Sequence, residues 1–144
     1  MKVYGMCDKT TLEVIHTKQN KLLKILYRKD HRFSTNALYN ELGLLKCMDV
    51  HKLYTYMFVY KQQNNMLPSV FNNYYAKNHT IFTRSTRQSN DLHLPFFRLS
   101  GGQKSLKYYG AKIWNDLPTD IKNIVSLSAL KQSLVLMLKA TYKD

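Results

Sequence analysis

The chain of 144 residues contains little cysteine, and the two it has, Cys7 and Cys47, lie far apart without a C-x-x-C pair. This spacing argues against a disulfide scaffold and a zinc ribbon, and it favours a reducing compartment. Long apolar runs are missing too, since no stretch reaches the roughly 18 apolar residues of a membrane span. Residues 1–6 lack the apolar core of a signal peptide. We therefore expect an intracellular protein, cytoplasmic or nuclear, that is not secreted.

Acidic residues are also scarce. The nine Asp and Glu are scattered singly, whereas a polymerase or nuclease needs clustered carboxylates that hold two metal ions about 4 Å apart. The closest pair, Asp116 and Asp120, is explained by a turn and a helix start. The five histidines show no metal-ligand spacing, and no zinc-protease, phosphate-loop, dinucleotide or nucleophile-elbow motif occurs. The sequence therefore predicts no catalytic residue, no metal site and no cofactor, so the chain alone is not expected to be an enzyme.

Basic residues, in contrast, are abundant: Lys and Arg number 22 against nine acids, for a formal net charge of +13. This excess favours a polyanionic partner, with RNA or DNA first and an anionic membrane surface second. The length fits a single domain, 1–144, that can bury a core. We expect a mainly α fold with a minor β part. A helical bundle would span about 10–75, a loop about 76–90, and a small antiparallel β-hairpin with a closing helix about 91–142.

The clearest helix is predicted for "TTLEVIHTKQNKLLKILYR", where apolar and basic positions separate at the helical period. The apolar side carries Leu12, Ile15, Leu22, Leu23 and Leu26. The opposite side carries the candidate nucleic-acid-binding residues Lys18, Lys21, Lys24 and Arg28. A solvated basic face is the ordinary explanation for any one of these cations. Four of them within a few turns can also follow a phosphate backbone.

Further helices are predicted downstream. Residues 35–42 favour a short helix that Gly43 is placed to end. Next, a helix beginning near Asp49 has an aromatic-rich stripe. The stripe consists of Val50, Leu53, Tyr54, Met57 and Tyr60 or Lys61, and Tyr56 and Phe58 widen it. Aromatic rings can stack on bases, but at this spacing they are more typical of a core. Pro68 suits the first turn of another short helix.

The segment 76–90 is polar and weakly patterned, which indicates a surface loop. Arg84 and Arg87 lie there among hydroxyl side chains and can donate to phosphates, although a plain linker is an equal alternative. After it, "DLHLPFFRL" alternates like a β-strand, "SGG" makes a turn, and "SLKYYGAKIWNDLP" is expected to return as the second strand. Ser126 then caps the closing helix, which has an apolar stripe of its own.

The order of these pieces resembles the region that follows the polymerase core in reverse transcriptases of jockey-like non-LTR retrotransposons. The matching stretches are "VYGMCDKTTLEVIHTKQNKLLKILY", "TNALYNELGLLKCMDVHKLYTYMFVYKQQNNMLPSVF", "TRSTRQSNDLHLPFFR" and "YYGAKIWNDLPTDIKNIVSLSALKQSL". The last is similar to the family's G-x-x-x-W-N-x-L-P motif, formed here by Gly110, Trp114, Asn115, Leu117 and Pro118. We expect this stretch to be structural, with Trp114 as an apolar plug between the hairpin and the closing helix.

The resemblance implies a thumb or post-thumb segment of an RNA-directed DNA polymerase from a transposable element, without its catalytic part. The family's aromatic-x-Asp-Asp motif lies upstream of this region, and the chain contains no Asp-Asp. The implied partners are template RNA or primer duplex, held by phosphate contacts, and the upstream polymerase core, but not a membrane. The chain would then be a fragment or a degenerate copy. Two alternatives stay open: a basic helical protein-interaction module, and a relic open reading frame with no selected role.

Overall fold

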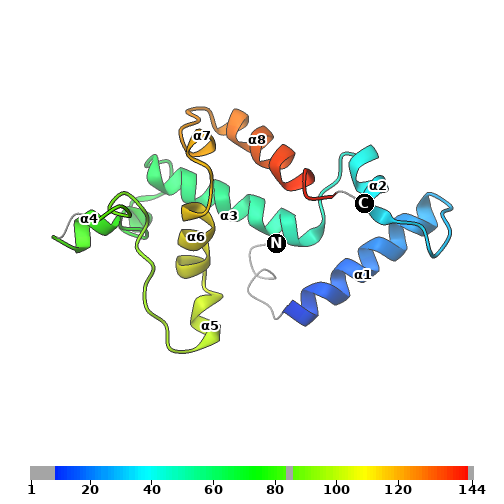
Figure 1. The fold of residues 1–144 in the computed structure, drawn as a ribbon, viewed down its shortest axis with the longest axis horizontal. Helices are drawn as coiled ribbons and strands as arrows, with labels where there is room; N and C mark the ends of the chain where they lie inside the picture. Colours follow the sequence, from blue (N-terminus) through cyan, green and yellow to red (C-terminus); the bar gives the residue numbers. More distant parts are fainter. Residues whose placement is uncertain (1–8, 84–85, 143–144) are drawn as a thin grey trace. The chain divides into compact units, whose positions relative to one another are not determined.

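The computed structural model describes residues 9–83 and 86–142. Within these ranges the chain is mainly helical, as predicted, but it has no β-strand, so the expected β-hairpin is wrong. The elements, coloured along the chain in Figure 1, are α1 (Lys9–Leu26), α2 (Thr35–Glu41), α3 (Cys47–Gln63), the 3-10 turn η2 (Ser69–Phe71), α4 (Asn78–Ile81), α5 (Ser100–Gln103), α6 (Leu106–Asn115), α7 (Thr119–Lys122) and α8 (Leu127–Lys139). None of the described helices has both the length and the apolar character that crossing a bilayer requires.

The chain divides into two compact units. Unit 1 comprises the described residues of 1–54 and 128–144, and unit 2 comprises those of 55–127. Helix α3 therefore contributes its first half to unit 1 and its second half to unit 2. The single domain 1–144 expected from the sequence stays a prediction.

Unit 1 has a small core to which α1, α2 and the end of the chain contribute. The buried residues are Leu23, Leu38, Tyr39 and Tyr142, with Phe33, Leu42 and Leu45 packed against them. Helix α1 supplies only Leu23 to this cluster, and amide side chains fasten it further. Gln19 donates to the Leu45 carbonyl at 3.2 Å and accepts from the Cys47 N–H at 3.0 Å. Asn20 accepts from the Tyr39 hydroxyl at 2.9 Å.

The predicted apolar stripe of α1 is only partly buried. Ile15, Leu22 and Leu26 belong to it, yet they are exposed by 37%, 56% and 64%. Val14 and Ile25, outside the stripe, are exposed as well. Hydrophobic stabilisation scales with the area removed from water, so these side chains add little to it. The hydrogen bonds of the α1 amides therefore hold much of this helix in place.

Unit 2 is built around aromatic side chains from the second half of α3 and the segment after it. Three rings meet Phe58 edge-on. They belong to Phe71, Tyr74 and Tyr75, with centroids 5.5, 5.8 and 6.3 Å from that of Phe58. Edge-to-face pairs are a favoured arrangement that adds to the energy of burial itself. Tyr60 lies beside Trp114 of α6, with centroids 6.5 Å apart. Tyr56, Phe58 and Tyr60 are buried, as the sequence predicts for this stripe, but Tyr54 is exposed by 49%.

The segment expected to form the second hairpin strand is helix α6. Its start is capped by Ser105, whose hydroxyl oxygen accepts from the Tyr108 N–H at 3.3 Å. The large apolar residues that follow stand at positions i, i+3, i+7, i+8 and i+11. These are Leu106, Tyr109, Ile113, Trp114 and Leu117. Helical spacing and the cap together outweigh the strand propensity of Tyr, Ile and Trp, which is why the extended assignment fails.

The first expected strand, within 91–99, has no strand partner among the described residues. It makes an isolated antiparallel bridge, between Leu92 and Lys77. Leu92 is buried, but Leu94 is exposed by 40% and Phe96 by 91%. The alternation in the sequence therefore does not separate a core face from a solvent face here. The preceding segment, expected to be a loop, contains the single-turn helix α4.

Candidate nucleic-acid interface

The four candidate cations at α1 all lie in unit 1. Lys18, Lys21 and Arg28 are exposed, whereas Lys24 is half-buried. Lys24 Nζ donates to the His31 carbonyl at 2.5 Å, so this cation also holds the turn that follows the helix. The structure therefore keeps three of the four free to reach a ligand and gives Lys24 a second, structural task.

Two adjoining hollows follow this basic side of α1. The larger, of about 540 Å³, is lined by Lys21, Lys24 and Arg28 together with Ile25, Lys29 and His31. The other, of about 450 Å³, is lined by Lys18, Lys21 and Val14, among others. Because Lys21 and Thr17 line both, the hollows are neighbours along the helix. We call the two together the α1 groove.

Arg28 enters the α1 groove from a backbone conformation that is unusual for arginine. Its φ is +49°, in the left-handed region, and it ends α1 in a Schellman arrangement. The Arg28 N–H donates to Ile25 O at 3.2 Å, and the Lys29 N–H donates to Lys24 O at 2.9 Å. Helices α2 and α3 end in the same way, but there Gly43 (φ +67°) and Asn65 (φ +54°) take the left-handed position.

The contrast between these three helix ends points to function. Glycine and asparagine are the residues that tolerate the left-handed region, and another side chain there costs about 1–2 kcal/mol. Strain of this kind gathers where the surroundings need a particular side chain. At position 28 an arginine lines the basic hollow, although glycine would adopt the left-handed conformation at a lower cost in free energy.

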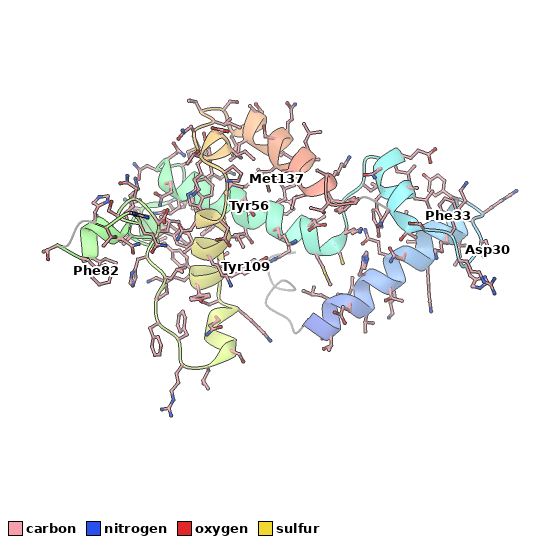
Figure 2. The ribbon with its side chains drawn as sticks, viewed as in Figure 1. Asp30, Phe33, Tyr56, Phe82, Tyr109 and Met137 are labelled. Carbon is pink, nitrogen blue, oxygen red and sulfur yellow. The ribbon has the colours of Figure 1, made fainter. Side chains whose placement is uncertain are left out.

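Lys29 and His31 were not predicted as site residues. They follow the last predicted cation directly in the sequence, but a helical projection cannot place them, because they lie beyond the helix end. The tight turn places both residues beside α1, so that they line the same hollow as Lys21 and Lys24. In the turn, Lys29 Nζ lies 5.0 Å from the centroid of the Phe33 ring. The Asp30 carboxylate accepts from the Arg32 N–H at 2.8 Å within the same turn. Figure 2 labels Asp30 and Phe33 in this turn.

The second predicted cluster is not assembled in the same way. Arg87 is exposed in unit 2, and Arg84 lies outside the described residues. The proposed contact of Arg87 with phosphate stays a prediction.

The G-x-x-x-W-N-x-L-P residues are structural, as expected, although they lie on and after a helix. Gly110 leaves room for Tyr75, since a Cβ at this position would come within 2.1 Å of the Tyr75 hydroxyl. That hydroxyl donates to Leu106 O on the same helix at 2.7 Å. Trp114 is only 8% exposed and lies in the unit 2 core, whereas the hairpin that it was expected to close is not formed.

The rest of the motif closes α6. The Asn115 side chain forms two hydrogen bonds with the backbone of Leu92. Its oxygen accepts from the Leu92 N–H at 2.9 Å, and its nitrogen donates to the Leu92 carbonyl at 2.8 Å. Leu117 is buried, and Pro118 stands at the cap position before α7. Each position of the motif therefore has a packing or hydrogen-bonding task.

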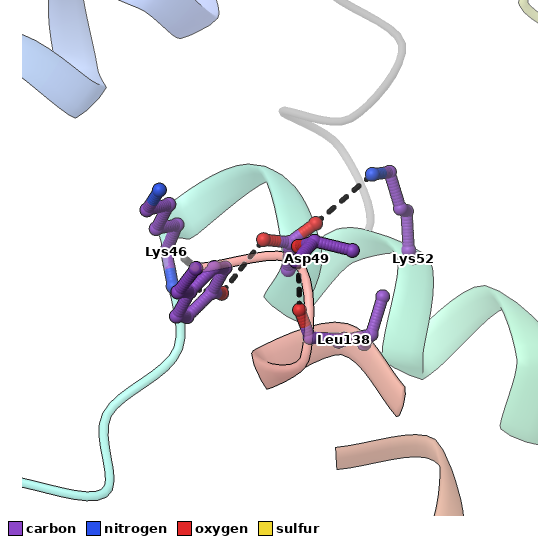
Figure 3. A network of polar contacts seen from close by, with 6 residues as sticks. Lys46, Asp49, Lys52 and Leu138 are labelled. Carbon is purple, nitrogen blue, oxygen red and sulfur yellow. Dashed lines mark hydrogen bonds and ion pairs between the residues drawn. The ribbon is translucent and has the colours of Figure 1, made fainter. Parts of the chain in front are cut away.

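A buried carboxylate in unit 1 is also structural. Asp49, in the first turn of α3, accepts from Lys52 Nζ at 2.9 Å and from the Tyr142 hydroxyl at 2.7 Å (Figure 3). The Tyr142 oxygen in turn accepts from the Lys46 N–H at 3.0 Å. Burial and the bond to Asp49 raise the pKa of Tyr142 far above its usual range. Both oxygens of the Asp49 carboxylate accept a hydrogen bond, and the bond from Tyr142 links that residue to α3.

Burial likewise raises the pKa of Tyr39, next to this network, to about 12. Cys47 is a free thiol, and burial raises its pKa too, which argues against a reactive thiolate. Within the described ranges, no group of three or more His, Cys, Asp or Glu side chains could hold a metal ion.

Comparison with known proteins adds no assignment, because no protein-family model, curated protein or solved structure matches the chain.

Proposed function

We propose that this chain is a non-catalytic nucleic-acid-binding segment that holds RNA or DNA by its phosphates, with the α1 groove as the principal contact. The observation that carries the proposal is the groove itself. It gathers Lys18, Lys21, Lys24 and Arg28 along one helix, and Arg28 keeps its place there in a strained conformation. Phosphate contacts of this kind position a nucleic acid without reading its sequence.

The salt dependence of binding tests the proposal. Each phosphate neutralised on duplex adds about −0.9 to the slope of log affinity against log salt, and about −0.7 on single strands. If each of the four cations meets one phosphate, the groove contributes roughly −3.6 on duplex by the same relation. Changing Lys18, Lys21, Lys24 and Arg28 together to Gln should remove most of that contribution. Fluorescence anisotropy across a salt series measures both slopes.

Two further variants separate the groove from general charge and from folding. The combined change of Arg98, Lys104, Lys107 and Lys131 to Gln removes the same number of cations at exposed positions outside the groove. A triple change that spares Lys24 leaves its bond to His31 intact. The triple variant should lose most of the slope and the outside variant little. Equal losses in the outside and groove variants, with circular dichroism preserved, would show that the groove is not the site.

The proposal extends to the parent protein. The chain would be the C-terminal segment of a retrotransposon-encoded RNA-directed DNA polymerase, working with an upstream polymerase core. The order of its motifs, up to the Gly110 to Pro118 stretch, supports this parentage. The genomic DNA upstream tests it, since an in-frame aromatic-x-Asp-Asp motif is expected there. The isolated chain should extend no primer with Mg²⁺ or Mn²⁺, and extension above background would contradict the non-catalytic assignment.

A protein-interaction module is the second candidate, and one observation favours it. Leu22, Ile25 and Leu26 are exposed on α1 by 56%, 74% and 64%, beside the cations of the groove. An acidic amphipathic partner could cover both kinds of side chain. This candidate predicts weak nucleic-acid binding by the unchanged chain and the same salt slope in all variants.

A further inference from the structure

Unit 2 contains a cavity whose lining differs in composition from that of the α1 groove. Its volume is about 730 Å³, within the range of roughly 300–1,000 Å³ that small-molecule sites occupy. The lining includes the ring of Phe82, the imidazole of His93, the carboxylates of Asp91 and Asp116, and the amine of Lys112. Two of the nine acidic residues of a chain with charge +13 therefore line this one hollow.

The wall of the cavity is held from two sides. The backbone of 91–93 pairs with 76–78: the Asn78 N–H donates to Asp91 O at 2.9 Å, and the His93 N–H donates to Ala76 O at 2.8 Å. The Asn115 amide forms hydrogen bonds with both the N–H and the carbonyl of the intervening residue, Leu92. A wall fixed this way presents its side chains in a set geometry before any ligand arrives. That preorganisation lowers the entropic cost of binding.

Two aromatic rings meet at this wall, and one of them is open to solvent. The Phe82 and His93 rings meet edge to face, with centroids 5.6 Å apart. Phe82, labelled in Figure 2 at the end of α4, is exposed by 53%, so its ring is open to a ligand. Every nucleobase has a face that can stack on such a ring, whatever the sequence.

The carboxylates supply hydrogen-bond acceptors with free capacity. Among the residues that the structure describes, neither Asp91 nor Asp116 forms an ion pair or a side-chain hydrogen bond. A phosphate would be repelled by these groups, so the cavity itself does not suit the nucleic-acid backbone. The exocyclic amines of cytosine, adenine and guanine are neutral donors that a carboxylate accepts well.

One cation lines the hollow, and two others are close to its lining residues in structure or in sequence. Lys112 lines the cavity, and Lys122 Nζ donates to the carbonyl of the lining residue Asn115 at 2.8 Å. Arg87 stands in the sequence between two lining residues and is exposed. Acceptors and an aromatic face inside, with cations near the lining, match a base held inside and phosphates held at the rim.

We infer that this cavity binds an unstacked nucleobase of a single strand, with Phe82 as the stacking surface and Asp91 and Asp116 as acceptors for the base edge. A duplex keeps its bases stacked and paired, so it cannot use the site without paying to extrude one. The inference rests on the proposed function, because the strand is first drawn to the chain by its charge. It adds a preference for single strands and for amine-bearing bases.

The test compares binding of short oligo(dC), oligo(dT) and duplex DNA by anisotropy. Phe82→Leu keeps the position apolar and removes the ring, so oligo(dC) binding should weaken about 5- to 50-fold while duplex binding changes little. Phe96→Leu is the matched control, because Phe96 is 91% exposed and does not line the cavity. Equal single-strand affinity for the parent and Phe82→Leu would overturn the inference.

The acceptors are tested by charge-matched variants. The parent should prefer oligo(dC) over oligo(dT) by about two- to ten-fold, the worth of a hydrogen bond or two. Asp116→Asn should reduce this preference, whereas Asp120→Asn, an equal charge change on α7 outside the cavity, should keep it. A parent without any preference, or an unchanged one in Asp116→Asn, would remove the acceptor role.

The outcomes also separate this inference from the proposed function. If the groove variants lose the salt slope but Phe82→Leu behaves like the parent, the phosphate-binding proposal stands and the base site falls. If Phe82→Leu weakens oligo(dC) alone while the groove variants keep the parent slope, the base site stands and the α1 groove falls. A parent that binds no nucleic acid at low salt overturns both.

Discussion

The two units of this chain are held together by different means. Unit 2 packs rings on rings, with Phe58 meeting three aromatic neighbours edge-on and Trp114 beside Tyr60. Unit 1 has an apolar cluster around Tyr39, and directional polar contacts add to it, such as those of the Gln19 amide and the Asp49 carboxylate. The contrast lies in the contacts themselves, because both units leave large apolar side chains exposed, such as Ile25 of α1 and Phe96 of unit 2.

This difference bears on binding. Helix α6 buries Gly110, Ala111 and Trp114 on one side, and its other side, with the exposed Lys112, contributes to the lining of the unit 2 cavity. Helix α1 is fastened at a few points by side-chain amides, so most of its circumference stays accessible. Segments with few buried apolar contacts also unfold locally at a lower cost in free energy. The candidate interface therefore lies on the less deeply packed helix, as binding elements often do.

The largest effect is expected from removing the ring that fills unit 2. Trp114→Ala leaves a cavity in a packed aromatic core and should lower the free energy of unfolding by about 3–5 kcal/mol. Chemical denaturation monitored by circular dichroism measures the change. Trp114→Phe keeps part of the volume and should cost clearly less. A Trp114→Ala midpoint equal to that of the parent would mean that unit 2 does not depend on this plug.

The fold was predictable where one signal dominates. The periodic stripe and the amphipathic division of α1 and the apolar stripe of α8 appear in the sequence, and so does the end of α2 at Gly43. Helix α6 was not predicted, because its Tyr, Ile and Trp favour strands and the preceding residues alternate. What decides for the helix is the Ser105 cap and the contact of Gly110 with Tyr75, and the second of these is not local in sequence.

The next effect concerns the polar fastening of unit 1. Tyr142→Phe keeps the buried ring but removes the hydroxyl that joins Asp49 and the Lys46 N–H. Hydrogen bonds to charged groups are worth about 1.5–3 kcal/mol, and a buried carboxylate that loses one partner is costly. We expect a loss of that size in the free energy of unfolding. If the variant is as stable as the parent, the ring alone holds the chain end.

The candidate site was also predictable only in part, because some of its residues are placed by contacts that are not local in sequence. The cations of α1 follow from helical spacing, and the structure brings them together in one groove. Lys29 and His31 depend on a turn whose left-handed residue is an arginine, which no turn rule would select. The unit 2 cavity depends on Asn115 reaching Leu92 across 23 positions of sequence, a contact without a local signal.

A smaller effect, of opposite sign, is expected at the end of α1. Arg28→Gly relieves the left-handed strain and should raise the free energy of unfolding by up to about 1 kcal/mol. The same change removes a cation from the groove, so the affinity for nucleic acid should fall and the salt slope should lose about 0.9 on duplex. Stability and binding would thus move in opposite directions. A variant that loses stability, or binds as well as the parent, would show that Arg28 is not kept there for a ligand.

The smallest effect is a pH dependence in the part of α3 that belongs to unit 1. His51 is half-buried, and burial lowers its pKa below the ordinary 6.5. The unfolded chain then binds a proton near pH 6.5 that the folded chain accepts only at lower pH, so stability falls as the pH drops through this window. Above it the contribution is fully present. His51→Gln removes the titration, and its melting temperature should fall less than that of the parent between about pH 7 and pH 5. The comparison cancels the other histidines, which both proteins share. If the two melting curves shift in parallel over this range, His51 is not buried enough to sense the pH.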